Sequence, residues 1–249
     1  MSSILQHAIR LLAVAERQIL GSRSGRSISL PAPDSICAWC HRCGAPRLGV
    51  FESENYFERL GCRKCYGVCL ARDRTIRLGT YDNRWREAIL AVKHGGDRAL
   101  ARELGTLLAR QWQQTIVAHS FIADSAVVIP IPMPLARRVE RGIDHAREIA
   151  VGVSKALGIS MARCLEHDAG PVQAMLTRAD RQSRAQRIRW KSASKWEFDA
   201  RLASDRQAFE TIFLVDDVLT TGSTAAQACA AIRSRLGAPQ IVMLVVATT

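Results

Sequence analysis

The chain has 249 residues and a mass of 27.5 kDa, enough for one α/β domain with a small attachment or for two modest domains. Its hydrophobic fraction of 48% and charged fraction of 23% exclude disorder throughout, and no apolar run reaches the roughly 18 residues of a membrane span. The net charge of +12 predicts an anionic partner such as a nucleic acid, a nucleotide or a diphosphate.

The N-terminal segment lacks the basic flank, apolar block and cleavage site of a secretory signal, so we expect a soluble, cytoplasmic protein. Apolar residues recur at helical spacing over residues 4–20 and predict an amphipathic helix. Residues 21–33 are rich in Gly, Ser, Arg and Pro, a linker composition. We therefore assign residues 1–35 to an N-terminal helix and linker.

Six of the eight cysteines lie in one segment at short, regular spacing. Disulfides seldom persist in the cytosol, so paired C-x-x-C steps more often hold a metal there. Cys40 with Cys43 and Cys62 with Cys65 form two such steps separated by eighteen residues, which is zinc-ribbon spacing. Four thiolates fill the tetrahedral sphere of Zn²⁺, so the pattern predicts a structural zinc ion.

Two other ligand sets stay open, one using Cys37 with Cys40 and one using Cys69 with Cys65, and His41 is a further candidate. The few apolar residues between the two C-x-x-C steps cannot form a core of their own, so metal binding must contribute folding energy. We predict a zinc ribbon over residues 36–70.

From residue 74 onward, helical and strand patterns alternate. The predicted helices are residues 85–90, 99–113, 144–157 and 224–236. The predicted strands are residues 126–131, 211–215 and 241–247. This alternation predicts an α/β domain over residues 74–249, with a mostly parallel sheet flanked by helices.

Residues 178–195 carry the densest positive charge of the chain. Trp190 and Trp196 lie among these cations and can stack on the bases of a single strand, so one hypothesis is a nucleic-acid patch. A solvated helix face or a hood over a nucleotide site explains the charge equally well. The candidate patch residues are Arg178, Arg181, Arg184, Arg187, Arg189 and Lys191.

Residues 212–224 form the most specific motif. Four apolar residues predict a strand buried on both faces, and Asp216 and Asp217 follow at its carboxyl end, where open α/β sheets bind ligands. Small and hydroxyl-bearing residues then open the next helix, whose N-terminal N–H groups suit a phosphate. This phosphate loop consists of Thr220, Thr221, Gly222, Ser223 and Thr224.

Two acids beside a phosphate would repel it unless they faced sugar hydroxyls or a divalent cation, so the motif predicts a sugar phosphate. Two alternatives remain. Asp216 or Asp217 can act as a phosphoryl-accepting nucleophile, or a threonine of the loop can simply cap the helix.

Residues 212–224 resemble the phosphoribosyl pyrophosphate (PRPP) motif of type I phosphoribosyltransferases. From about Cys37 onward the chain resembles the ComF/GntX family, in which a zinc module precedes a phosphoribosyltransferase-like domain. The other matching segments are residues 81–82, 90–96, 128–132, 141–146, 173 and 176–181.

The resemblance implies a type I phosphoribosyltransferase-like fold that binds PRPP or a nucleotide monophosphate with Mg²⁺. It implies that Asp216 and Asp217 bind the ribose hydroxyls and that the phosphate loop holds the 5′-phosphate. It places the pyrophosphate near Lys93, Arg137, Arg138 and Arg141. For Lys93, a favourable interaction with the end of a helix is an equally good explanation.

The family usually reads R-G-F-N-Q-A where this chain has Asp144 and His145 after Arg141-Gly142-Ile143. The sequence shows no partner carboxylate for His145, so we expect it to be an ordinary surface or packed histidine.

Three functions follow from the resemblance. If the domain turns over, pyrophosphate is displaced from the anomeric carbon of PRPP, although no residue stands out as a general base. The alternative is a competence accessory protein for DNA uptake that binds single-stranded DNA and a helicase-type partner. A nucleotide-sensing regulator is the third.

Overall fold

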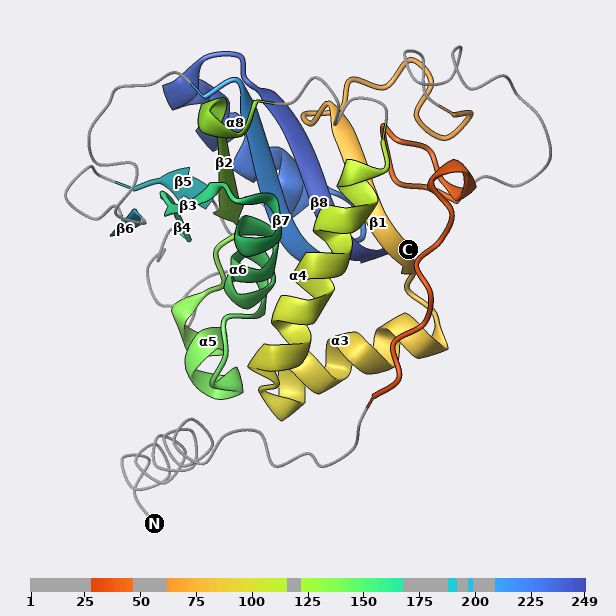
Figure 1. Ribbon diagram of the computed structural model, residues 1–249. Helices are drawn as coiled ribbons and strands as arrows, with labels where there is room; N and C mark the ends of the chain where they lie inside the picture. The colour runs from red at the N-terminus through yellow and green to blue at the C-terminus, as the bar shows by residue number, and fades with distance from the viewer. Residues whose placement is uncertain (1–27, 47–61, 116–121, 168–187, 192–196, 199–208) are drawn as a thin grey trace, which may run out of the picture.

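The computed structural model describes residues 28–46, 62–115, 122–167, 188–191, 197–198 and 209–249 (Figure 1). The helix predicted at residues 4–20 lies outside this part of the chain, as does most of the predicted linker. Among the described residues, no helix combines the length and the apolar character needed to cross a membrane.

A six-stranded sheet forms the centre of the described structure (Figure 1). In spatial order its strands are β1 (Arg74–Thr80), β8 (Gln240–Thr248), β7 (Thr211–Leu219), β2 (Ala126–Pro130), β3 (Ser160–Arg163) and β6 (Glu197–Phe198). The first five are parallel, and β6 runs antiparallel to β3. The predicted mostly parallel α/β sheet is confirmed.

Helices cover both faces of this sheet. One face, in front in Figure 1, carries α3 (Asn83–Gly95), α4 (Arg98–Gln113) and α6 (His145–Leu157). The opposite face carries α8 (Ser223–Leu236). Three of the four predicted helices are confirmed to within one residue at each end, and the run predicted at 85–90 is the middle of the longer α3.

Capping residues explain where the three helices of the first face begin. Asp82, Asp97 and Asp144 each accept a hydrogen bond from a backbone N–H of the following turn. Helices α3 and α6 both end at a glycine with positive φ, Gly96 and Gly158. Helix α8 differs, because its N-cap is Gly222, which has no side chain to cap the first turn.

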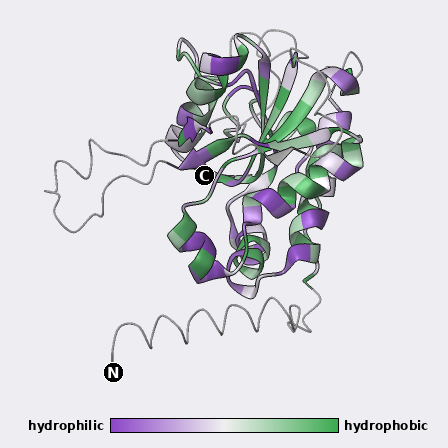
Figure 2. Cartoon of the chain, turned by 90° about the vertical axis from the view of Figure 1, so that its left-hand side faces the viewer, coloured by the Kyte–Doolittle hydropathy of each residue, from purple (hydrophilic) through white to green (hydrophobic). Residues whose placement is uncertain are grey.

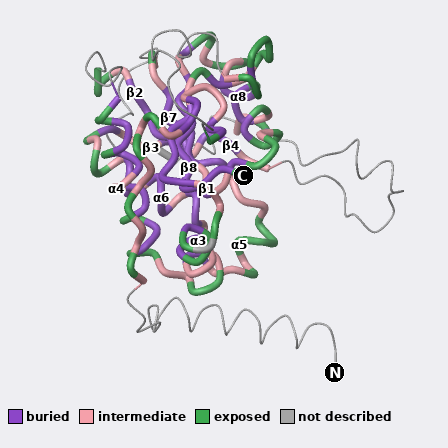
Figure 3. Tube along the Cα trace, turned by 90° about the vertical axis from the view of Figure 1, so that its right-hand side faces the viewer, coloured by how far each residue is buried: buried purple, intermediate pink, exposed green. Residues whose placement is uncertain are grey.

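Hydrophobic residues dominate the sheet (Figure 2), and buried residues run along β1, β8, β7 and β2 (Figure 3). The buried apolar side chains form two clusters. On β7, Phe213 and Val215 belong to the cluster that contains α3, α4 and α6, whereas Ile212 and Leu214 belong to the cluster that contains α8. Trp112 of α4 packs edge-on against Phe213, with ring centroids 5.2 Å apart. This alternation accounts for the uninterrupted apolar run in the sequence.

Several elements were not predicted. They are β1, β3, β6, the helix α5 (Leu135–Arg141), the antiparallel pair β4 (Leu165–His167) and β5 (Ile188–Trp190), and the short 3₁₀ helices η1 (Ile36–Ala38) and η3 (Ala123–Ser125). The strand predicted at 211–215 was too short, because β7 continues through both acids to Leu219. Asp216 and Asp217 therefore lie within the last part of the strand.

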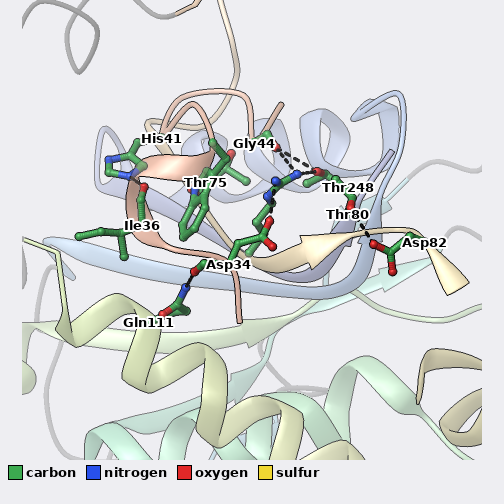
Figure 4. Close-up of polar contacts among 11 residues, drawn as sticks. Asp34, Ile36, His41, Gly44, Thr75, Thr80, Asp82, Gln111 and Thr248 are labelled. Atoms are coloured by element: carbon green, nitrogen blue, oxygen red, sulfur yellow. Dashed lines mark hydrogen bonds and ion pairs between the residues drawn. The ribbon is translucent and has the colours of Figure 1, made fainter. Parts of the chain in front are cut away.

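The described part of the predicted zinc ribbon, residues 36–46 and 62–70, packs against β1 on the side away from α4. We call these residues the cysteine module. The indole N–H of Trp39 donates to the carbonyl of Thr75 at 3.1 Å. Arg77 of β1 donates to the carbonyl of Gly44 at 3.1 Å and to the hydroxyl of Thr248 at 2.6 Å (Figure 4).

Two further contacts hold this junction. Arg77 pairs with the carboxylate of Asp34 at 2.7 Å, and the backbone carbonyl of Asp34 accepts from the side-chain amide of Gln111 on α4 (Figure 4). Gly44 has a φ of 81°, and a Cβ there would lie 2.8 Å from a methyl group of Thr75. The module thus approaches the sheet as closely as a backbone without a side chain allows.

Candidate functional site

The strand order reverses between β2 and β7. From β2 the chain crosses through α6 to β3, and from β7 it crosses through α8 to β8 on the other side. In open α/β sheets such a reversal leaves a crevice at the carboxyl ends of the two strands, and ligands bind there. Asp216 and Asp217 stand near the carboxyl end of β7, at this point of the sheet.

Asp217 makes two close ionic contacts. Its Oδ2 lies 2.6 Å from Nζ of Lys93 and 3.1 Å from Nε2 of His145. Lys93 belongs to the last turn of α3, and His145 is the first residue of α6. All three side chains are largely buried. The structure thus places Lys93, predicted on the pyrophosphate side, against an acid of the motif.

The expectation for His145 was wrong, because this histidine has a partner carboxylate. It is 7% exposed, and its Nδ1 is buried without a hydrogen-bond partner among the described residues. Asp144 has a local role as the N-cap of α6, where it accepts from the N–H of Arg147 at 3.2 Å. Asp144 and His145, which depart from the family pattern, therefore have separate roles: Asp144 caps α6, and the imidazole of His145 contacts Asp217.

The pKa values of Asp216 and Asp217 are shifted in opposite directions. Burial opposes ionisation of Asp217, but the hydrogen bond and charge of His145, together with the charge of Lys93, lower its pKa below the ordinary value. Burial, and then the charge of Asp217, raise the pKa of Asp216 well above the ordinary value. Asp217 is thus an anion paired with two side chains, whereas Asp216 accepts, among the described residues, only a backbone hydrogen bond, from the N–H of Asp217 at 2.9 Å.

A cation is one partner that Asp216 can accept. His145, Asp216 and Asp217 bring one ligand atom each to within 4.8 Å of one another. Carboxylate oxygens suit Mg²⁺, whereas an imidazole nitrogen suits transition metals better. The donor set accordingly fits a divalent cation held mainly by the acids.

The phosphate loop lies at the other end of the same turn. Gly222 has a φ of 78°, and the N–H of Ser223 donates to the hydroxyl of Thr221 at 3.4 Å. Thr220, Thr221, Ser223 and Thr224 are exposed. The N-cap residue Gly222 has no side chain to cap α8, and the bond from Ser223 to Thr221 is long, so the first turn of the helix keeps N–H groups for an external acceptor. This arrangement suits an anion.

Four cysteines come together in the cysteine module. The Sγ atoms are 3.7 Å apart for Cys40 and Cys65, 3.6 Å for Cys43 and Cys62, and 4.0 Å for Cys62 and Cys65. Tetrahedral zinc with bonds of about 2.3 Å requires sulfur separations of about 3.8 Å. The four residues can therefore hold a structural metal such as zinc, and they are the quartet that the spacing predicts.

The electrostatics of this cluster favour a thiolate. Hydrogen bonding with Cys43 lowers the pKa of Cys40 to about 4, while burial raises the pKa of Cys65 to about 11. Cys37 and Cys69 are exposed and lie outside the four-cysteine group. His41 is not part of it either, and its Nε2 contacts the carbonyl oxygen of Ile36 at 2.7 Å. The division of the chain at residues 36–70 stays a prediction.

The arginines predicted near the pyrophosphate lie on α5, beyond the end of β2. Arg137 and Arg138 are exposed, and Arg141 is the last residue of the helix. Arg138 lines a cavity of about 270 Å³ together with Arg163 and Lys191. Lys93 does not line this cavity and pairs with Asp217 instead.

Only part of the predicted nucleic-acid patch is described. Arg189 pairs with Glu166 at 3.0 Å, and Lys191 lines the cavity beside α5. The other four patch residues lie outside the described residues: Arg178, Arg181, Arg184 and Arg187. DNA binding therefore stays a prediction, as does a helicase-type partner.

Comparison with models of known protein families finds none that matches this chain, and comparison with curated proteins finds no significant match. The functional assignment consequently depends on the motifs and on the geometry of the site.

Proposed function

We propose that this protein binds PRPP or a related pentose 5-phosphate at the carboxyl edge of β7. The phosphate loop would hold the 5′-phosphate, and Asp216 would face the ribose hydroxyls together with Mg²⁺. One observation carries this proposal: an acid pair and an uncapped helix start follow each other directly at the reversal of strand order. The resemblance of residues 212–224 to the PRPP motif supports the same ligand.

The charges around Asp217 support the proposal. Lys93 and His145 compensate this carboxylate, so it repels a nearby phosphate less than a bare acid pair would. Asp216 has no close side-chain cation of its own among the described residues, and burial, then the charge of Asp217, raise its pKa despite a hydrogen bond from the N–H of Asp217. A ribose hydroxyl donating to Asp216, or a divalent cation bound to it, relieves this penalty. An anionic sugar that brings both groups suits the site better than phosphate alone.

If the protein turns over PRPP, a nucleophile forms a bond to the anomeric carbon while the bond to the pyrophosphate oxygen breaks. The electron pair leaves with the pyrophosphate. When bound, Mg²⁺ supplies charge neutralisation for this leaving group. The chain's own contribution is to position the ribose at Asp216 and to place cations such as Arg138 at the end of β2. We propose zinc in the cysteine cluster as a structural ion, because four thiolates leave it no open position.

Titration calorimetry of the zinc-loaded full chain with PRPP and Mg²⁺ tests the proposal. We expect saturable binding that Asp216→Asn weakens at least tenfold, because the amide loses the charged interaction with the cation and the hydroxyls. Glu210→Gln is the matched control, since Glu210 is an exposed acid just before the opposite end of β7. Absence of PRPP binding, or equal affinity for both variants, would contradict the proposal.

A further inference from the structure

A cavity of about 400 Å³ lies between the cysteine module and the phosphate loop. Thr220, Thr221, Gly222 and Ser223 line one side, and cysteine-module residues line the other. The side chains that line this cavity include two cations, Lys64 and Arg72, but no aspartate or glutamate. The acid pair does not line it, so the charge of this space differs from that around Asp216.

Arg72 is the central feature of this cavity. It is only 8% exposed, and two of its three nitrogens are used inside the protein. Its Nε donates to the hydroxyl of Thr75 at 2.8 Å, and its Nη2 donates to the carbonyl of Cys43 at 3.2 Å. Its Nη1 has no hydrogen-bond partner among the described residues. That atom would lie 3.3 Å from a Cβ built on Gly222, so it is directed at the start of α8.

Burial lowers the pKa of Arg72, but a guanidinium keeps its charge under ordinary conditions. Burying a cation with one unpaired donor costs free energy, and a bound anion would offset that cost. The first turn of α8 also favours an anion, because its N-cap Gly222 has no side chain, the N–H of Ser223 makes only a long bond of 3.4 Å to Thr221, and the helix dipole is positive there. These two independent features face one space.

We propose that the cysteine module completes the phosphate site. A phosphate at the start of α8 is held from the sheet side by the loop and from the module side by Arg72 and Lys64. The proposal rests on the phosphate loop of the proposed function and adds Arg72 and Lys64, two cations that belong to no sequence motif. The ligand is a phosphomonoester dianion, because the lining offers cations, hydroxyls and N–H groups to the phosphate and apolar surface from Val68 and Leu70 beside them.

The same contacts couple the phosphate site to the metal. Arg72 is held by the carbonyl of Cys43, and both Cys43 and Cys65 line the cavity. When the metal leaves, the loops that carry these residues lose their common anchor. Phosphate affinity then falls because Arg72 and Lys64 are no longer in place.

A competing explanation is that Arg72 only offsets the negative thiolates of the metal cluster. An acid placed in the cavity separates the two explanations without touching Arg72. Ala226 is exposed, lines the cavity and belongs to the first turns of α8. Glutamate is favourable near a helix N-terminus, so Ala226→Glu should fold normally. Ala230→Glu is the matched control, one turn further along α8 and outside the cavity lining.

The experiment measures binding of inorganic phosphate and of ribose 5-phosphate to the zinc-loaded full chain by calorimetry. We expect Ala226→Glu and Arg72→Gln to weaken both ligands about tenfold to a hundredfold, the loss of a charged hydrogen bond, at unchanged zinc content. Lys64→Gln should weaken them less, because Lys64 is exposed. Arg63→Gln and Ala230→Glu should change affinity less than twofold.

Equal phosphate affinity in wild type, Ala226→Glu and Arg72→Gln would overturn the inference while leaving PRPP binding through Asp216 intact. Phosphate binding that depends on Arg72, combined with PRPP binding that ignores Asp216→Asn, would support the inference and contradict the proposed function. Absence of phosphate binding in the zinc-loaded wild type would overturn the inference whatever PRPP does. Zinc removal should lower phosphate affinity in wild type, and unchanged affinity would also overturn it.

Discussion

The two faces of the sheet are covered by different means. On one face, α3, α4 and α6 bury apolar side chains against β1, β8 and β7. On the other face, α8 covers the centre, and the cysteine module covers β1 through contacts to Thr75 and Arg77 that are mostly polar. Apolar burial is non-directional and tolerates small shifts, whereas hydrogen bonds to a buried guanidinium require fixed geometry.

This difference between apolar and polar contacts indicates which face of the sheet can depend on a bound metal. The helix-covered face owes its stability to area removed from water. The module-covered face depends on a few donors and acceptors close to the four cysteines that can hold a structural metal. The cavity beside the phosphate loop lies on the module-covered face, and we therefore expect its affinity for phosphate to depend on metal binding.

The largest effect should follow from loss of a metal ligand. Cys65→Ser leaves three thiolates in the cluster, so we expect zinc content to fall well below one ion per chain and the module to lose its fixed position against β1. Atomic absorption and thermal unfolding measure both consequences. Cys69→Ser is the control, because Cys69 is exposed and outside the four-cysteine group. Equal zinc content in the two variants would refute the quartet.

Arg77 tests the polar junction itself. Arg77→Met removes its bonds to Gly44, Thr248 and Asp34, although the carbonyl of Gly44 keeps the hydroxyl of Thr248 as a donor. We expect the free energy of unfolding to fall by about 3 kcal/mol, the lower end of the cost of breaking a buried ion pair, because the carboxylate of Asp34 is partly exposed to solvent. Urea unfolding measures it, with the exposed Arg86→Met as control. A loss under 1 kcal/mol would show that the junction is held by other contacts.

Asp217 is a buried polar residue on the helix-covered face, and the two acids Asp216 and Asp217 should respond to pH with opposite signs. Since the pKa of Asp217 is lowered on folding, its contribution is present above the unfolded value of about 3.9 and is lost as pH falls below it. Since the pKa of Asp216 is raised, its contribution is present below about 3.9 and is lost as pH rises.

We therefore expect Asp217→Asn to destabilise the protein at pH 7 by about 3 kcal/mol and less in acid, because Lys93 and His145 lose their anion. Asp216→Asn should stabilise it at pH 7 and have little effect at pH 4. Urea unfolding of both variants between pH 2 and 8 provides the comparison. If both substitutions shift stability in the same direction at pH 7, the assignment of the two roles is wrong.

Local patterns in the sequence predict much of this molecule. Residues 212–215 and 241–247 read as strands because a parallel strand covered on both faces is apolar at every position. The four-cysteine cluster follows from spacing because C-x-x-C brings its own two thiols together. In both cases the information lies within a few residues.

The missed features depend on partners that are distant in the chain. β1 alternates Thr75 and Arg77 with Ile76 and Leu78, which reads as a strand with one face in water, yet that polar face is buried under the module. His145 and Arg72 gave no signal of their own. The available signal for His145 was its departure from the family pattern directly after a helix-capping aspartate.

The smallest effect concerns the closest contact on the helix-covered face, where α4 and α6 cross at glycines. A Cβ on Gly152 would overlap the carbonyl oxygen of Arg102, so Gly152→Ala must push the helices apart. Overpacking of this kind costs about 1 to 3 kcal/mol, offset by up to about 1 kcal/mol from the better helix propensity of alanine. Gly95→Ala is the control: no atom lies within 4 Å of a Cβ at this position, at the end of α3, so the substitution changes only the helix propensity.

Urea unfolding should therefore show Gly152→Ala less stable and Gly95→Ala slightly more stable than wild type. A stabilising Gly152→Ala would mean that the apolar face is less tightly fixed than the polar junction with the module.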